Sequence, residues 1–429
     1  MTALRFCHLT TFYPPHSFGG DAVGIQRLAR ALVRRGHHVT VVCDVDAYNA
    51  LHGGPEPELE PEAESDGVRV VRLRSGLGTL SPFLTQQFGA PVVNGRQIAR
   101  LLESEAFDVV NFHNVSLIGG PGLLRFGSGV KLYMAHEHWL VCPSHVLWRH
   151  DREPCTGRQC VRCVTAYRRP PQFWRYSRRL ERAARHIDTF IAMSEFSRAK
   201  HREFGFEPEM DVLPYFLPEP VAPPERGPLK SPHDRPYFLF VGRLETIKGL
   251  DTVIPVFRDY PTADLLVAGD GTQATALTAL AAGSPRVRFL GRLATEALAP
   301  YYRHALALIV PSVGFETFGI ILIEAFQNGT PVIARRIGPF PEIVDRAQAG
   351  ELFASSAELV AAMRRIQDDP AYRETLARNG SAAVPRYWTE SAVVPRYLDI
   401  VRRAAARRGI THVVDALPTL ALREASSSG

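Results

Sequence analysis

The chain begins with a strand, a loop with glycines and a helix, and this order limits the folds open to it. Residues 4–9 read as a buried strand, and Gly19 and Gly20 lie in the loop that follows. The helical segment IQRLARALVRRG then leads to a second apolar strand at residues 37–45. Strands joined through a helix in this way lie parallel in one sheet. The sequence therefore predicts an α/β fold with a doubly wound sheet, and the glycines allow backbone to approach a ligand closely.

A proline-rich segment divides the chain into two parts. Residues 214–236 contain eight prolines and show no periodicity, which is typical of a semi-rigid linker. A new strand, loop and helix begin directly after it. We expect an N-terminal domain at residues 1–213, a C-terminal domain at residues 237–385, a helical segment at residues 386–408 and a flexible tail at residues 409–429.

Two carboxylates stand out in the stretch GFETFGIILIEAFQNGTPVIA, residues 314–334. Glu316 lies in the loop before a helix, and Glu324 lies inside the helix among aliphatic residues. Eight residues of helix separate them by roughly 12 Å, beyond the ~5 to 9.5 Å of a glycoside-hydrolase acid and base. They can hold the two ends of one long ligand whose anionic middle faces free backbone N–H groups. Those N–H groups belong to Phe318, Gly319 and Ile320.

A nucleotide sugar has this shape, and two cations extend the pattern. Arg243 and Lys248 follow the first strand of the second part, in VGRLETIKG, and can stabilise a departing diphosphate. The plainer alternatives stay open at this point. Glu316 can simply complement the helix dipole, Glu324 can meet a core arginine, and the two cations can be exposed surface residues.

Two histidines end predicted strands of the first part. His113 closes FDVVNFHN, and His136 follows GVKLYMA. Ligands of open α/β sheets lie beyond the carboxyl ends of the strands, so both histidines point toward a ligand site, with the stronger expectation for His113. Each can equally be a core or loop histidine with its hydrogen bonds satisfied.

Four of the six cysteines form a cluster with the spacing C-x12-C-x4-C-x2-C. The cysteines are Cys142, Cys155, Cys160 and Cys163. In an intracellular chain such a cluster favours a metal site over disulfides. We expect structural zinc, with an iron–sulfur cluster, redox thiols or incidental thiols as alternatives.

The charge pattern restricts partners and location. The formal net charge of +6 is too small to indicate nucleic acid binding. Residues 162–185 interleave arginine with Phe, Trp and Tyr, which fits a solvated helix face, an acidic acceptor or an anionic membrane surface. No apolar run reaches the ~18 residues of a membrane span. We expect a cytoplasmic protein, with peripheral contact at the inner face of the membrane as an open alternative.

Taken together, these motifs resemble a known family. The glycine loop with its helix, VNFHN, MSEFSR, VGRLETIKGLD, VAGDG and the Glu-x7-Glu stretch followed by PEIV are similar to the retaining glycosyltransferases of family four. The resemblance covers residues 5–403. It implies a GT-B fold, in which two Rossmann-like doubly wound domains face each other across a cleft. It also implies that the nucleotide sugar lies mainly on the second domain and that the last helix crosses back to the first.

The same resemblance implies roles for the residues. Glu316 would bind hydroxyls of the donor sugar, and Glu324 would bind the ribose. The loop of Gly19 and Gly20 would approach the phosphates from the first domain, and His113 would lie near the transferred sugar. The remaining donor contacts would come from Arg243 and Lys248 on the diphosphate and from the backbone of Phe318, Gly319 and Ile320.

The reaction implied is sugar transfer with retention of configuration and without a metal at the reaction site. UDP is the carrier that the family favours, and the acceptor would be a hydroxyl of a glycan, a lipid-linked sugar or a small metabolite. Two features depart from the family pattern: Gly338-Pro339-Phe340 replaces a Gly-Gly pair before PEIV, and the four-cysteine insertion lies in the acceptor-side domain. A nucleotide-sugar epimerase and a non-enzymatic sugar-nucleotide binding module are the alternative functions.

Overall fold

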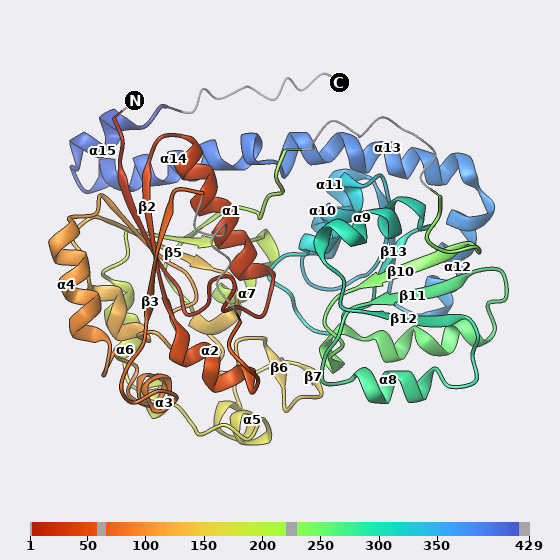
Figure 1. The fold of residues 1–429 in the computed structure, drawn as a ribbon, viewed down its shortest axis with the longest axis horizontal. Helices are drawn as coiled ribbons and strands as arrows, with labels where there is room; N and C mark the ends of the chain where they lie inside the picture. Colours follow the sequence, from red (N-terminus) through yellow and green to blue (C-terminus); the bar gives the residue numbers. More distant parts are fainter. Residues whose placement is uncertain (1, 58–65, 220–229, 420–429) are drawn as a thin grey trace.

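Buried apolar runs form the strands of two separate parallel sheets (Figure 1). The computed structural model describes residues 2–57, 66–219 and 230–419 of the 429 residues. We call the part with the first sheet the first domain and the part with the second sheet the second domain. Both are doubly wound and Rossmann-like, so the expected GT-B arrangement of two such domains is confirmed.

The first sheet has seven strands in the order β3-β2-β1-β4-β5-β8-β9. Its strands are β1 (Arg5–Leu9), β2 (His38–Asp44), β3 (Val68–Leu73), β4 (Val109–Phe112), β5 (Val130–Ala135), β8 (Thr189–Ala192) and β9 (Met210–Val212). All neighbouring pairs are parallel, and β4 and β5 are buried along their whole length. A central strand covered on both faces needs a continuous apolar run, which explains sequences such as VKLYMA.

Helices cover both faces of this sheet. The helices of the first domain are α1 (Gly20–Arg34), α2 (Val45–His52), α3 (Leu80–Phe88), α4 (Gly95–Glu105), α5 (Cys160–Ala166), α6 (Arg179–Ala184) and α7 (Glu195–Glu203), of which α5 belongs to the cysteine-bearing insertion. The cysteine-bearing insertion also contains a small antiparallel hairpin of β6 (Trp148–Arg149) and β7 (Glu153–Pro154). The switch in strand order lies between β1 and β4, where ligands of such sheets bind.

The second sheet has six strands in the order β12-β11-β10-β13-β14-β15. Its strands are β10 (Tyr237–Val241), β11 (Asp264–Ala268), β12 (Val287–Gly291), β13 (Leu308–Val310), β14 (Val332–Arg335) and β15 (Gly350–Phe353). The helices around it are α8 (Ala274–Leu280), α9 (Thr295–His304), α10 (Ile320–Gln327), α11 (Phe340–Ala347) and α12 (Ser356–Asp368). The strand order reverses between β10 and β13, so this domain has its own switch point.

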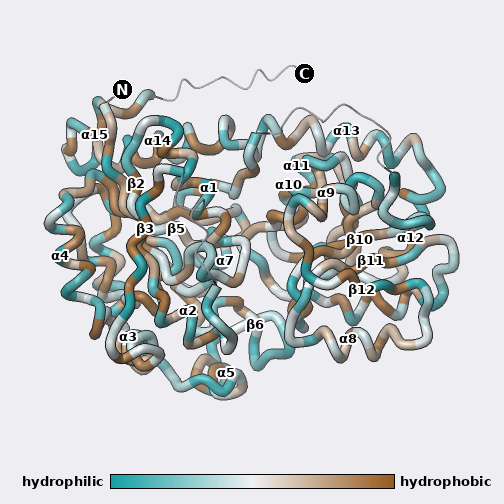
Figure 2. The backbone as a smooth tube through the Cα atoms, viewed as in Figure 1, coloured by the Kyte–Doolittle hydropathy of each residue, from teal (hydrophilic) through white to brown (hydrophobic). Residues whose placement is uncertain are grey.

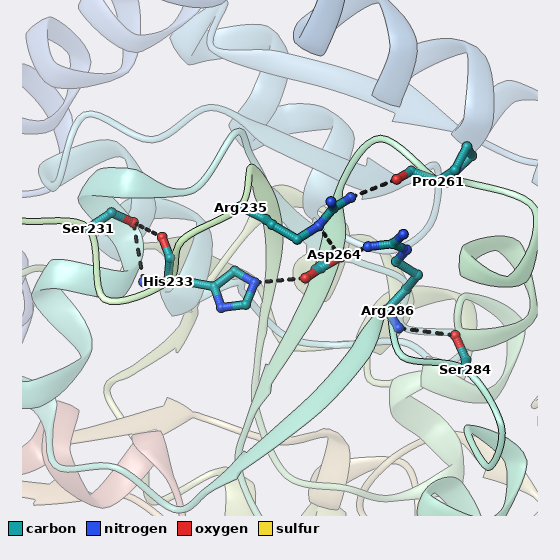
Figure 3. A network of polar contacts seen from close by, with 7 residues as sticks. All are labelled: Ser231, His233, Arg235, Pro261, Asp264, Ser284 and Arg286. Carbon is teal, nitrogen blue, oxygen red and sulfur yellow. Dashed lines mark hydrogen bonds and ion pairs between the residues drawn. The ribbon is translucent and has the colours of Figure 1, made fainter.

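A buried carboxylate fixes the amino-terminal end of the second sheet (Figure 3). Asp264, the first residue of β11, accepts hydrogen bonds from His233 Nε2 at 2.8 Å, Arg235 Nε at 3.2 Å and Arg286 Nη1 at 3.4 Å. Burial raises the pKa of Asp264, but the bonds from His233 and Arg235 outweigh burial and hold the pKa below its ordinary value. This network ties the chain before β10 to the sheet, at the end opposite the switch point.

Two long helices near the end of the chain connect the domains along one side of the molecule (Figure 1). They are α13 (Pro370–Tyr387), which packs on α10 and α11, and α14 (Glu390–Arg407), which packs on α1 and β5. Residues 220–229 of the expected linker lie outside the described residues. Just before them, Tyr215, Phe216 and Leu217 are buried in a core that both domains share.

One expectation about the chain end is wrong. The sequence predicts a flexible tail at residues 409–429, but α15 (Thr411–Ala416) packs on α14 and buries Val413 and Ala416. These apolar side chains lie on one side of the short helix, which gives it a core to pack against. Residues 420–429 lie outside the described part.

The distribution of hydrophobic residues follows the two sheets (Figure 2). Apolar residues concentrate in the strands at the centre of each domain, whereas hydrophilic residues are frequent in the helices around them. No helix within the described ranges is long and apolar enough to cross a bilayer.

Candidate functional site

The loop after β13 brings a carboxylate and a cation together. Glu316 accepts hydrogen bonds from Lys248 Nζ and from Ser312 Oγ, both to Oε1 and both at 2.7 Å. Lys248 ends the short 3-10 helix η5 (Thr246–Lys248) after β10, so the pair lies at the carboxyl ends of the two strands at the switch point. The two side chains are 20% and 23% exposed. They can therefore exchange contacts with a ligand, and neither is locked in the core.

A glycine makes this pairing possible. Gly249, which follows Lys248, has a φ of 66°, and a Cβ there would lie 2.3 Å from the Pro311 carbonyl oxygen. The turn after β10 thus lies directly against the loop after β13. Only glycine adopts this conformation without strain and leaves room for the carbonyl.

The partner of Glu324 comes from the other domain. Arg27 of α1 lies with Nη2 3.7 Å from Glu324 Oε1, and its Nη1 donates to the Phe216 carbonyl at 3.4 Å. Burial raises the pKa of Glu324, and Arg27 offsets only part of that rise. A core arginine was one of the possible partners of Glu324 in the sequence. The structure contains this partner, Arg27, but it belongs to the other domain.

Two helix N-termini face each other at this place. Gly19 precedes α1 and Gly20 begins it, and a Cβ on Gly20 would lie 3.3 Å from Ile320 Cδ1 at the start of α10. No protein acceptor among the described residues receives the backbone N–H groups at the start of α10. These N–H groups belong to Phe318, Gly319 and Ile320. Helix N-termini carry positive partial charge, so the two ends together favour an anion between them.

Further charged groups surround the two helix ends. Arg243 is 56% exposed and donates to Glu245 Oε1 at 2.8 Å. Burial raises the pKa of Asp21, in the first turn of α1, and the charge of Glu137 raises it further, while Arg243 lowers it. Arg243 from the second domain thus interacts electrostatically with an acid of the first.

His113 lies in a buried chain of hydrogen-bonded rings. Its Nε2 is 2.7 Å from His8 Nδ1 and its Nδ1 is 2.8 Å from His136 Nε2. His136 Nδ1 is in turn 2.5 Å from the Tyr215 hydroxyl. Burial lowers the pKa of His8 and of His136 to about 3 and lowers that of His113 well below its ordinary value. All three rings are neutral near pH 7, and His113 is 1% exposed. Its contact with a sugar stays a prediction.

The four cysteines of the insertion line one small cavity, of about 20 Å³, with Leu147 and Phe204. Cys163 Sγ accepts the backbone N–H of His150 at 3.3 Å, and all six cysteines are free thiols. However, no group of three or more His, Cys, Asp or Glu side chains in the described part of the chain is arranged to hold a metal ion. The expected zinc site is therefore not supported by the structure.

The insertion lies beside the loop that carries Glu316. A Cβ on Gly314 would lie 3.3 Å from Trp148 of the hairpin, and Phe315 packs against the cluster of Cys142 and Leu147. Two hydrogen bonds also join the domains here. Ser194 Oγ donates to the Thr317 carbonyl at 2.6 Å, and Thr317 Oγ1 donates to the His136 carbonyl at 2.7 Å.

The departure at Gly338-Pro339-Phe340 also lies beside this loop. A Cβ on Gly338, which has a φ of 64°, would lie 3.6 Å from the Glu316 backbone nitrogen. Pro339 precedes α11, whose Glu342 accepts the Phe196 N–H at 3.3 Å from the first domain.

Besides Gly19, Gly20 and His113, the first domain contributes residues that sequence reasoning missed. Arg27, Asp21 and Glu137 lie in or after the predicted loops, but nothing local distinguishes them from surface charges. His8 and Tyr215 were also missed, because the ring chain joins residues far apart in the sequence. The packing of one domain on the other reveals Arg27, Asp21 and Glu137, whereas the order of the strands in the first sheet brings His8 to His113.

Known proteins match both domains. The family model described as "Glycosyl transferase 4-like domain" matches residues 19–215, and the model described as "Glycosyl transferases group 1" matches residues 222–383. Glycogen synthase of Mycobacterium tuberculosis (strain ATCC 25618 / H37Rv) is 38% identical over 404 residues, 87% of this chain and 89% of that protein. D-inositol 3-phosphate glycosyltransferase 1 of Catenulispora acidiphila is 28% identical over 411 residues, 90% of this chain and 92% of that protein.

Solved structures share the fold over nearly the whole chain. Sucrose-phosphate synthase from Thermosynechococcus elongatus has a TM-score of 0.68 at 22% identity, covering 96% of this chain and 99% of that chain. Anabaena HepE in complex with UDP-glucose has a TM-score of 0.64 at 18% identity, covering 95% and 100%. At these identities the two likenesses show the fold alone.

Proposed function

The chain belongs to the nucleotide-sugar-dependent glycosyltransferases with a GT-B fold, and we propose that it transfers a sugar from a UDP-sugar to a hydroxyl acceptor with retention of configuration and without a metal at the reaction site. The observation that carries the proposal is the pair of Lys248 and Glu316 beside two facing helix N-termini. UDP as the carrier is supported by the neighbouring fold crystallised with UDP-glucose.

In this proposal the donor lies along the start of α10. The diphosphate occupies the space between the N-termini of α1 and α10, where free N–H groups and the exposed Arg243 provide positive charge. Lys248 turns from Glu316 to the diphosphate, and the released carboxylate accepts hydrogen bonds from the sugar hydroxyls. Glu324 takes the ribose hydroxyls at the other end, about two helical turns away.

Retention follows from attack on the same face of the sugar that the diphosphate leaves. The bond from the anomeric carbon to the phosphate oxygen breaks, and its electron pair stays on the diphosphate. The acceptor oxygen forms the new bond to the anomeric carbon and passes its proton to that phosphate oxygen. The cations stabilise the charge that develops on the leaving group, which is where electrostatic catalysis is strongest.

The acceptor is proposed to bind to the first domain, as a glycan, a lipid-linked sugar or a small metabolite. The ring chain of His8, His113 and His136 stays neutral and places the His136 carbonyl against Thr317, next to Glu316. In this proposal His113 acts by positioning, because its ring is buried and both of its nitrogens are hydrogen-bonded to histidines.

Variants of the pair test the proposal. In a thermal-shift screen of UDP-, GDP- and ADP-sugars, we expect stabilisation by a UDP-sugar. Glu316→Ala should lose sugar transfer by about 100-fold or more while it still binds UDP, and Lys248→Ala should weaken binding of both UDP and the UDP-sugar. Glu374→Ala, at an exposed carboxylate of α13, is the matched control.

Two results would contradict sugar transfer at this site, and a third would contradict retention. One is full transfer activity in the Glu316 variant. The other is epimerisation of the donor sugar without an acceptor, seen by proton NMR, which would identify a nucleotide-sugar epimerase. Product NMR then settles the stereochemistry, because an inverted anomeric proton coupling excludes retention.

Structural zinc on Cys142, Cys155, Cys160 and Cys163 is a separate proposal that rests on their spacing and on the cavity that they share. Four thiolates suit tetrahedral zinc, whereas the four thiols as they lie in the structure do not form a site. Elemental analysis of protein purified without chelator should find about one zinc per chain. Metal-free protein with four titratable thiols in this insertion would exclude the ion.

A further inference from the structure

The helix α3 carries its large apolar side chains on the side that faces solvent. Between Arg74 and Arg96 the chain contains no Asp, Glu, Lys or Arg. The side of α3 that faces the protein is formed by Ser81, Pro82 and Thr85, which are buried. Its outer side carries large apolar residues instead, although an ordinary surface helix has its polar side outward.

The neighbouring segments extend this outer side. Six of the eleven exposed large hydrophobic residues in the described ranges lie here, each between 46% and 70% exposed. We call them the apolar surface: Leu77, Leu80, Phe83, Phe88, Phe173 and Tyr176. The last two belong to the 3-10 helix η4 (Phe173–Tyr176), which is held against α3 because Trp174 Nε1 donates to the Gln86 carbonyl at 2.8 Å. Large contiguous apolar areas on a protein surface mark interaction sites.

A strongly basic segment borders the apolar surface. Residues 155–187 contain nine arginines and one acidic residue, Glu181. Arg168, Arg169 and Arg178 are exposed, and Arg179 donates to the Phe88 carbonyl at the end of α3. Figure 1 shows α3, α5 and α6 at the same end of the first domain, on the side away from α13 and α14.

A groove beside the apolar surface carries the same charge. It has a volume of about 1620 Å³ and reaches Val161 and Tyr176, and the residues that line it include nine arginines and five acidic residues, so that its net charge is positive. The surroundings of the apolar surface are therefore positive on the exposed side and inside the groove. A partner that covers the apolar residues must also bring negative charge.

We propose that this end of the first domain binds the headgroup region of an anionic bilayer. Phe and Tyr prefer the boundary between headgroups and acyl chains, and arginine binds lipid phosphates. A second copy of the chain would cover the apolar residues but would leave the arginines without compensating charge. The surface is independent of the donor site, and it would bring the first domain to an acceptor carried by a lipid.

Sedimentation with vesicles tests this directly, without donor or acceptor. The full chain should bind vesicles of phosphatidylcholine with 30 mol% phosphatidylglycerol and should bind phosphatidylcholine alone far more weakly, with a marked loss at high salt. Arg168→Glu with Arg169→Glu should weaken binding roughly 25-fold or more. Phe83→Ser with Phe173→Ser should weaken it about tenfold or more.

A matched pair of charge reversals separates binding at this surface from a general effect of net charge. Arg364→Glu with Arg378→Glu changes the same charge on exposed positions of α12 and α13 and should leave vesicle binding unchanged. All four substituted sites of the test variants are exposed, so their melting temperatures should stay near that of the unaltered protein. Equal binding to both lipid mixtures, or unchanged binding in both variants, would overturn the proposal. A dimer in sedimentation velocity that the Phe83 and Phe173 variant abolishes would assign the apolar surface to a second copy instead.

Discussion

The ionised carboxylate of Glu324 destabilises the folded protein when no donor is bound. Its side chain is half-buried on α10, 23% exposed, and its cationic partner, Arg27, lies 3.7 Å away, beyond a short hydrogen bond. The net effect raises the pKa of Glu324, so ionisation is less favourable in the folded chain than in the unfolded one. Ribose hydroxyls that donate to this carboxylate would offset the cost when the donor binds.

This cost predicts a stability change with a defined pH dependence. A carboxyl group whose pKa is raised on folding stabilises the folded state below its unfolded pKa and loses that contribution as pH rises through the folded pKa. Glu324→Gln should therefore increase the free energy of unfolding at pH 7 by about 1 kcal/mol, measured by urea denaturation. The difference from the unaltered protein should disappear near pH 4.

The same variant should bind the UDP-sugar more weakly, since an amide is a poorer acceptor for ribose hydroxyls. Glu374→Gln, at an exposed position, should change neither property. A Glu324 variant that is less stable at every pH would mean that attraction to Arg27 outweighs the cost of burial.

At the scale of elements, the turn after β10 decides where Lys248 lies. Gly249 and Gly36 both have positive φ angles, 66° and 85°. A Cβ on Gly249 would collide with the backbone of Pro311, whereas a Cβ on Gly36 would meet no atom of the described residues within 4 Å. Gly36→Ala should cost about 1 kcal/mol of stability from backbone strain alone. Gly249→Ala adds a clash with the Pro311 carbonyl, which must push η5 and Lys248 away from Glu316.

We therefore expect Gly249→Ala to lose more stability than Gly36→Ala and to raise the KM for the donor at least tenfold. Urea denaturation and initial-rate measurements compare the two variants. If both glycine variants lose the same stability and keep the same KM, the turn does not position Lys248.

Helices and strands with a clear periodic pattern of apolar residues could be predicted from the sequence. Elements whose stability depends on tertiary contacts could not. The strands VKLYMA and LALIVPS are recognisable as apolar runs, and the glycine turns mark the loops between strands and helices. The residues of α15 carry the same kind of apolar pattern, but the segment is too short to show whether it has anything to pack on. The exposed side of α3 was missed because an apolar pattern reads as buried until its surroundings are known.

At the scale of the molecule, the site depends on how the domains meet. Glu316 and Lys248 come from one domain, and their pairing follows from strand order, which the sequence pattern implies. The contacts from the first domain do not follow in this way. Ser194 and Thr317 are 123 positions apart, and Thr317 and His136 are 181 apart. No local pattern encodes such pairs, because they depend on the rigid-body position of two separately folded units.

These few polar contacts close the molecule over the proposed donor position. Arg27 meets Glu324, Ser194 meets the Thr317 carbonyl and Thr317 meets the His136 carbonyl. A donor that contacts Glu324 and the start of α10 has to displace Arg27 or enter while the domains are apart. We expect these contacts to influence the balance between this closed arrangement and one in which the domains lie further apart.

Thr317→Val tests this balance, because it removes one hydrogen bond between the domains and keeps the side-chain shape. A bond worth about 1 kcal/mol changes the ratio of closed to open molecules by roughly fivefold. Amide hydrogen exchange at Phe318, Gly319 and Ile320 should quicken by that factor, while the free energy of unfolding falls by no more than about 1 kcal/mol. Thr375→Val removes a hydroxyl that bonds only within α13 and should leave exchange at these amides unchanged. Exchange that is equally slow in both variants would mean that the apolar core shared by the domains, and not these polar contacts, holds the molecule closed.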